Sequence, residues 1–152
     1  GPIVASAAAD PGWARRVVLV DALLETPDDG LDDLAARLAD ELRADPEAIA
    51  AAHPGWHPED VAIKVQGVAG CSPTVVERCL LDNRPWDHAG LVRDVRAPVT
   101  LLGAEHDALL APELGERLAA LSPSVTYRLV PGSGHSIHRD DPEPVVEAAL
   151  GS

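Results

Sequence analysis

Three short apolar runs, rich in β-branched residues, predict the strands of a parallel sheet. They cover residues 17–20, 98–103 and 125–130. The first run, Val17-Val18-Leu19-Val20, has no alternating polar positions, which is typical of a strand covered on both faces. Such strands belong to sheets flanked by helices. Helical patterns lie between the runs, so we expect an α/β fold with right-handed crossovers and about three strands.

Helices are predicted where apolar residues recur every three or four positions. One apolar face lies within residues 31–42, at the i, i+3, i+4, i+7, i+11 spacing: Leu31, Leu34, Ala35, Leu38 and Leu42. A second helix is expected to start at Ser72-Pro73 and to run to about Leu81, because Ser is a favoured N-cap and Pro a favoured first residue. A closing helix is expected over residues 142–150.

The segment between the first two strands is helical in pattern and interrupted by prolines, so it predicts an insertion into the α/β core. We expect a core segment over residues 1–26, a helical insertion over residues 27–95, and a second core segment over residues 96–152. Three strands are few for such a sheet, and a strand as apolar as residues 17–20 makes a poor free edge. The sheet is therefore expected to be incomplete.

Charge excludes several partners. Twelve Lys and Arg residues against 25 Asp and Glu residues give a net charge of −13. A chain this acidic repels nucleic acids and anionic membranes. The sequence contains neither an apolar run of the roughly 18–20 residues that a membrane span needs nor a signal-peptide pattern. These features predict a cytoplasmic protein.

The two cysteines, Cys71 and Cys79, are eight positions apart. On a helix this spacing separates them by about 12 Å, beyond the reach of a disulfide. We expect both to be small buried hydrophobic residues. His53 and His57 have the spacing of a helical metal pair, but Pro54-Gly55 between them disfavours a regular helix, so no metal site is expected there.

Candidate chemistry lies just beyond the predicted strands, where parallel sheets bind ligands. Asp21 follows the first strand, His106 and Asp107 follow the second, and His135 follows the third within Pro131-Gly132-Ser133-Gly134-His135. An Asp that holds an imidazole fixes its tautomer and stabilises the imidazolium formed during proton transfer. Asp107 and His135 fit these roles in chain order.

Together these motifs resemble the C-terminal half of an α/β-hydrolase. The resemblance rests on Gly103-Ala104-Glu105-His106-Asp107 after a strand, on Gly132-Ser133-Gly134-His135-Ser136 after the next strand, and on the final helix that follows Pro142-Glu143. Residues 3–21 are similar to the helix after the nucleophile of that family and to the strand that follows it. The insertion is similar to the family's cap.

The resemblance implies a catalytic triad with Asp107 as the acid and His135 as the general base. It also implies an ester, thioester or related carbonyl substrate of small apolar character, and no cofactor or metal. The sequence contains no Gly-x-Ser-x-Gly. In the family this motif would lie immediately before Ile3, with Gly1 as its last glycine. We therefore expect the N-terminal half of the same hydrolase, as a separate or cleaved chain, to be the partner that supplies the nucleophile.

Several of these residues also have an alternative structural interpretation. For Asp107 the alternative is a loop residue that caps the following helix. Asp21 is the second candidate acid, although a turn residue describes it more simply. Ser6, Ser72, Ser133 and Ser136 lack the surroundings of a nucleophile and are expected to pack, cap or hydrogen-bond locally.

The sequence also leaves two alternatives for the nucleophile and two for the function. The upstream nucleophile is Ser or Asp. A non-catalytic module on the same fold, which binds a ligand or partner, is the alternative function.

Overall fold

A computed structural model of the chain describes residues 2–26, 28–43 and 45–151. The strands are β1 (Val17–Val20), β2 (Glu25–Thr26), β3 (Trp86–Asp87), β4 (Val99–Ala104) and β5 (Val125–Val130). The helices are α1 (Pro2–Ala9), α2 (Asp28–Glu41), α3 (Pro46–Ala52), α4 (Pro58–Gly70), α5 (Pro73–Leu81), α6 (Ala89–Asp94), α7 (Pro112–Ala119), α8 (Ile137–Asp140) and α9 (Glu143–Leu150). None of the described helices is long and apolar enough to cross a membrane.

The main sheet has three parallel strands in the order β1-β4-β5. Val17 lies beside Val99, which in turn lies beside Val125, so the three strands start in register and end at the same edge. The α/β fold with a three-stranded parallel sheet is therefore confirmed. β1 forms one edge of this sheet.

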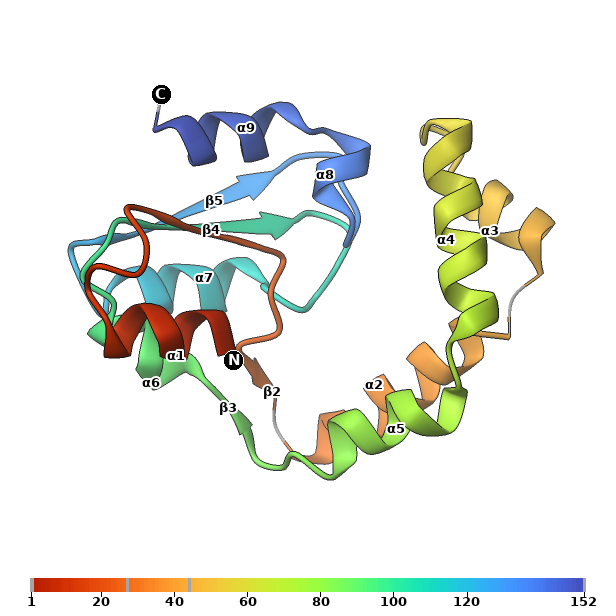
Figure 1. The fold of residues 1–152 in the computed structure, drawn as a ribbon, viewed down its shortest axis with the longest axis horizontal. Helices are drawn as coiled ribbons and strands as arrows, with labels where there is room; N and C mark the ends of the chain where they lie inside the picture. The colour runs from red at the N-terminus through yellow and green to blue at the C-terminus, as the bar shows by residue number, and fades with distance from the viewer. Residues whose placement is uncertain (1, 27, 44, 152) are drawn as a thin grey trace. The chain divides into compact units, whose positions relative to one another are not determined.

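Helices cover both faces of the sheet, which explains why its strands are apolar without alternation. Helix α7 packs against β4 and β5 on one side, and α9 packs against β1 and β4 on the other (Figure 1). The core on the α7 side includes the fully buried Leu101 and Leu118. The core on the α9 side includes Leu102, Val130 and Ile137.

The chain divides into two compact units. The first, which we call the sheet unit, combines the residues up to Glu25 with those from Asp87 onward, and the second, the helical insertion, is Thr26–Trp86. The short strands β2 and β3 pair where the chain passes from one unit to the other. An insertion over residues 27–95 was expected; residue 27 lies outside the described residues. The insertion ends at Trp86 and not at residue 95. The reason is that α6, which lies between these positions, buries Ala89 and Val92 in the core of the sheet unit.

The insertion is built from helices that pair two by two. Helix α2 packs against α5, and α3 packs against α4. The helix expected over residues 72–81 is observed as α5, with Ser72 at its N-cap and Pro73 as its first residue, although the Ser72 side chain makes no capping hydrogen bond. Asp45 does cap α3, because its carboxylate accepts a hydrogen bond of 2.7 Å from the Ala48 amide.

The prediction for the cysteines is wrong as regards burial. Cys71 and Cys79 are both free thiols and both exposed. Cys71 is the C-cap residue of α4, and Cys79 lies on a helix whose buried residue is its neighbour Leu80. The helix periodicity places Leu80 inward and turns Cys79 outward.

His53 and His57 have separate structural roles. The His53 ring stacks on Trp56 at a centroid distance of 3.8 Å. His57 is the N-cap of α4, and its Nδ1 accepts a hydrogen bond from the Glu59 amide. Helix α3 ends at Ala52 and α4 begins at Pro58, so the pair does not share one helical face.

Candidate functional site

The common end of the three parallel strands brings together side chains that are far apart in the sequence. Asp21 directly follows β1, Asp107 follows β4, and His135 follows β5. Because the strands are parallel and in register, these three positions fall at the same edge of the sheet. One ligand atom from each of the three residues lies within 4.8 Å of the others.

Asp21 is the carboxylate nearest to the imidazole. Its Oδ2 lies 2.9 Å from His135 Nδ1, and its side chain is 0% exposed. Its other oxygen, Oδ1, accepts a hydrogen bond of 3.4 Å from the Ala104 amide at the end of β4. The residue interpreted most simply as a turn residue therefore holds the histidine directly.

Asp107 also faces the imidazole, at a longer distance. Its Oδ2 lies 3.8 Å from His135 Nδ1, which is within reach of an ion pair and too long for a hydrogen bond. Its Oδ1 accepts a hydrogen bond of 3.0 Å from the Leu109 amide within its own loop. The structure thus brings Asp107 and His135 together, as expected, and adds Asp21, the second candidate acid, from the end of β1.

Several polar contacts hold the His135 loop in place. The Gly132 amide donates to Glu105 Oε2 at 2.7 Å, and the His106 amide donates to the Ser133 carbonyl at 3.0 Å. Both contacts tie this loop to the loop after β4. On the other side, the Gly134 amide donates to Asp140 Oδ2 at 2.8 Å. Because the loop is held at both ends, its histidine is presented in a fixed position.

Ser133 has a structural role, in agreement with its interpretation as a local hydrogen-bonding residue. Its buried hydroxyl donates to the Val130 carbonyl at 2.8 Å. Gly132 adopts a φ of 71°, a left-handed conformation that favours glycine. Glu105 was not predicted to have a role of its own; its contact with the Gly132 amide shows that it holds the loop.

Tyr127 of β5 packs in a slot between two glycines. A Cβ at Gly115 would lie 2.3 Å from the Tyr127 ring, and one at Gly103 would lie 2.6 Å from the tyrosine hydroxyl. That hydroxyl donates to the Leu110 carbonyl at 3.5 Å. Burial raises the pKa of Tyr127 above its usual value, and the negative charges of Asp21, Glu116 and Glu113 add to this effect. The neutral phenol therefore contacts the loop that carries Asp107, at the Leu110 carbonyl.

The other candidate residues lie apart from this contact. The His106 side chain is 66% exposed, and its Nε2 lies 4.0 Å from Glu105 Oε2. Ser6 is exposed on α1, and Ser136 precedes α8 as its N-cap residue. Trp56 is buried within the insertion, where it stacks on His53. Gly1, the expected last glycine of a nucleophile motif, lies outside the described residues.

The arrangement of these side chains is suited to proton transfer. Two carboxylate oxygens face one ring nitrogen, while the His135 side chain is 59% exposed. A carboxylate on Nδ1 favours the tautomer whose Nε2 can accept a proton, and it stabilises the imidazolium that results. Among the described residues, the same three side chains are also close enough to coordinate a single metal ion.

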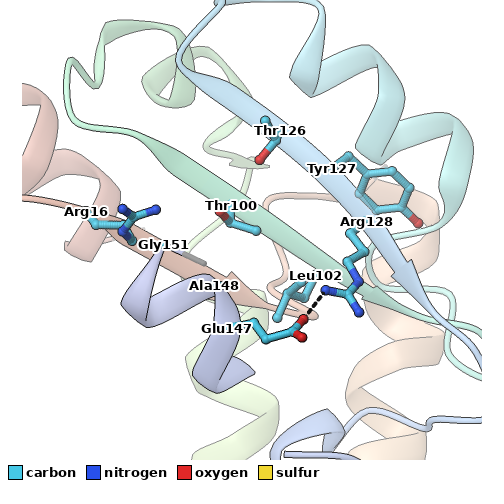
Figure 2. Close-up of a pocket in the computed structure, with 9 residues that line it drawn as sticks. All are labelled: Arg16, Thr100, Leu102, Thr126, Tyr127, Arg128, Glu147, Ala148 and Gly151. Carbon is cyan, nitrogen blue, oxygen red and sulfur yellow. Dashed lines mark hydrogen bonds and ion pairs between the residues drawn. The ribbon is translucent and has the colours of Figure 1, made fainter. Parts of the chain in front are cut away.

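A separate pocket of about 270 Å³ lies on the α9 side of the sheet (Figure 2). Its lining residues are Arg16, Thr100, Leu102, Thr126, Tyr127, Arg128, Glu147, Ala148 and Gly151. Arg128 and Glu147 form an ion pair of 2.6 Å at this pocket, as Figure 2 shows. Neither Asp21, Asp107 nor His135 lines it, so the pocket is not part of the histidine site.

Comparisons with solved structures agree on the fold. E-2-(acetamidomethylene)succinate hydrolase matches with a TM-score of 0.76 at 22% identity, over 98% of this chain and 61% of that one. A thermophilic esterase from Thermogutta terrifontis matches with a TM-score of 0.58 at 22% identity, over 90% of this chain and 54% of that one. The enol-lactonase from Burkholderia xenovorans LB400 matches with a TM-score of 0.63 at 15% identity, over 97% and 59%.

Each of these proteins is longer than the chain, which spans about 54–61% of their length. A comparison with curated protein sequences gives no match. The profile of the alpha/beta hydrolase family, in contrast, matches residues 1–148. The chain therefore belongs to the α/β hydrolase family.

Proposed function

We propose that this chain supplies the general base and its supporting carboxylate to a hydrolase that acts on an ester, a thioester or a related carbonyl compound. The observation that carries the proposal is the contact of His135 Nδ1 with two carboxylates, while more than half of the side chain stays exposed. Asp107 and His135 are the acid and base that the sequence motifs indicate. Family membership supports hydrolase chemistry in general.

In this mechanism His135 moves a proton from the attacking oxygen to the leaving-group atom. Its Nε2 takes the proton from a nucleophile hydroxyl as that oxygen attacks the carbonyl carbon. The imidazolium then gives the proton to the leaving group, whose bond to the carbonyl carbon breaks. Water attacks the acyl intermediate in the same way and regenerates the nucleophile. The carboxylates on Nδ1 stabilise the positive charge in both steps.

The nucleophile would come from an N-terminal portion of the same hydrolase, which we propose as the partner of this chain. β1 supports this proposal because it lies at the edge of the described sheet and contains only Val and Leu. Apolar edge strands tend to pair with another strand. With an Asp nucleophile in place of Ser, His135 would instead activate the hydrolytic water.

The function is tested by replacing the base in the assembled enzyme. The chain is co-produced with the N-terminal portion, and hydrolysis of p-nitrophenyl butyrate is followed. His135→Ala should lower kcat by about 10⁴- to 10⁶-fold, because the nucleophile and the supporting carboxylates all act through this base. His106→Ala is the matched control, because His106 is exposed beside the same sheet edge and should leave kcat unchanged. Full activity of His135→Ala would contradict the proposal.

The partner is tested by native mass spectrometry of the co-produced sample. A stoichiometric complex of the two portions is the expected result. If the chain remains a stable monomer after mixing with the N-terminal portion, the proposed partnership is wrong.

A further inference from the structure

Asp21 has an unusual backbone conformation for a residue at the end of a strand. Its φ is 40°, the one positive φ of a non-glycine residue within the described part of the chain. This left-handed region is unfavourable for residues with a Cβ, although Asp and Asn tolerate it better than others. Strained residues of this kind cluster at functional sites, where surrounding contacts hold them in place.

Backbone and side-chain contacts hold Asp21 in that conformation. Its amide donates to the Leu102 carbonyl at 2.7 Å, which extends the β1–β4 ladder by one residue. Its carboxylate then turns across the end of β4, where Oδ1 accepts from Ala104. The second oxygen is left for His135 Nδ1, at 2.9 Å. The strained turn thus directs a fully buried carboxylate at the imidazole.

The two carboxylates therefore differ in what they can do for the histidine. Asp21 Oδ2 is at hydrogen-bonding distance from Nδ1, whereas Asp107 Oδ2 is 3.8 Å away. Asp21 is also better protected from water, with a side chain 0% exposed against 17% for Asp107. A buried hydrogen bond to a charged group is stronger than an exposed contact at longer range.

We propose that Asp21 is the positioning residue that accepts the Nδ1–H hydrogen bond of His135, and that Asp107 acts as a second negative charge near the ring. The proposal deepens the proposed function and rests on it for its catalytic consequence. The proton on Nδ1 stays on nitrogen throughout. Asp21 fixes the tautomer that leaves Nε2 free to accept a proton, and both carboxylates stabilise the imidazolium.

The hydrogen bond is tested in the 152-residue chain by NMR, which requires no nucleophile. Long-range ¹H–¹⁵N spectra report the tautomer of each imidazole, and His135→Gln assigns the His135 signals. The downfield Nδ1–H resonance should be present in the unmodified chain, lost in Asp21→Asn and retained in Asp107→Asn. Both variants keep the side-chain size, and Asn tolerates a positive φ, so the pair is matched.

Loss of the resonance in Asp107→Asn with its retention in Asp21→Asn would overturn the proposal. If Asp21→Asn fails to fold, Asp107→Asn alone decides: a retained Nδ1–H resonance supports Asp21, and a lost one excludes it. Absence of the resonance from the folded, unmodified chain would also overturn the proposal.

The catalytic consequence is measured in the assembled enzyme. Asp21→Asn should lower kcat by about 10³- to 10⁴-fold with KM unchanged, because an amide favours the wrong tautomer. Asp107→Asn should lower kcat by about tenfold, because it removes only a charge. Reversed magnitudes would refute the assignment. If the assembled enzyme has no hydrolase activity, the proposed function fails, while the NMR result still decides the role of Asp21.

Discussion

The sheet unit and the helical insertion bury their apolar residues in different ways. In the sheet unit, Leu101 and Leu118 are 0% exposed and lie between strands and helices that are distant in the sequence. In the insertion, helices pack in pairs and carry exposed ion pairs, such as Arg84 with Asp32 at 2.6 Å. The sheet unit is therefore built on a ladder of parallel strands covered by helices, and the insertion on pairs of helices that pack against each other.

This difference explains where the candidate chemistry lies. Residues at the ends of a packed parallel sheet are fixed by the ladder on one side and by the core on the other. The contacts of Asp21 with Leu102 and Ala104 show this directly. Paired helices with exposed surfaces offer fewer such constraints. The strand ends of the sheet unit should consequently tolerate few substitutions, and the exposed helix faces of the insertion many.

The largest expected effect concerns the central strand. Leu101→Ala removes a fully buried side chain of β4 and should lower the free energy of unfolding by about 2–5 kcal/mol. Val75→Ala in α5 is the control, because Val75 is 62% exposed, and it should change the free energy by less than about 0.5 kcal/mol. Urea unfolding followed by circular dichroism measures both. Equal losses in the two variants would contradict the comparison.

Two glycines should respond to alanine with opposite signs. Gly115→Ala in α7 places a Cβ 2.3 Å from the Tyr127 ring and should destabilise the sheet unit by about 1–3 kcal/mol. Gly67→Ala in α4 meets nothing within 4 Å and should stabilise the insertion by about 0.5–1 kcal/mol, since Ala favours helix. Thermal unfolding of the two variants gives the sign directly, and a stabilised Gly115→Ala would disprove tight packing there.

The smallest expected effect is the difference in stability cost between removing two N-cap side chains of the insertion, at the start of α3 and at the start of α5. Asp45→Ala removes a capping bond to the Ala48 amide and should cost about 1 kcal/mol. Ser72→Ala removes a side chain that makes no capping hydrogen bond and should cost less than about 0.5 kcal/mol. Loss of helical circular dichroism on heating measures the difference. A Ser72→Ala variant as unstable as Asp45→Ala would show that capping does not distinguish these helices.

Local patterns were sufficient for the three strands of the main sheet and for several of the helices. The run Val17-Val18-Leu19-Val20 predicts β1 because a strand covered on both faces needs apolar residues at every position. Ser72-Pro73 predicts the start of α5 because Pro fits only the first turn of a helix. The same reasoning missed the exposure of Cys71 and Cys79, since residue type indicates a tendency for burial and not the direction of a side chain.

The amino-acid sequence by itself determined the three strands of the main sheet, the helices over residues 31–42, 72–81 and 142–150, and the placement of Asp107 and His135 in loops after successive strands. Only the tertiary structure decided which carboxylate meets the imidazole. Asp21 and His135 are 114 positions apart, and their contact depends on the strand order and on a φ of 40° at Asp21. Hydrophobic periodicity indicates which face of a segment is buried, whereas the direction of a loop side chain is set by contacts with distant strands.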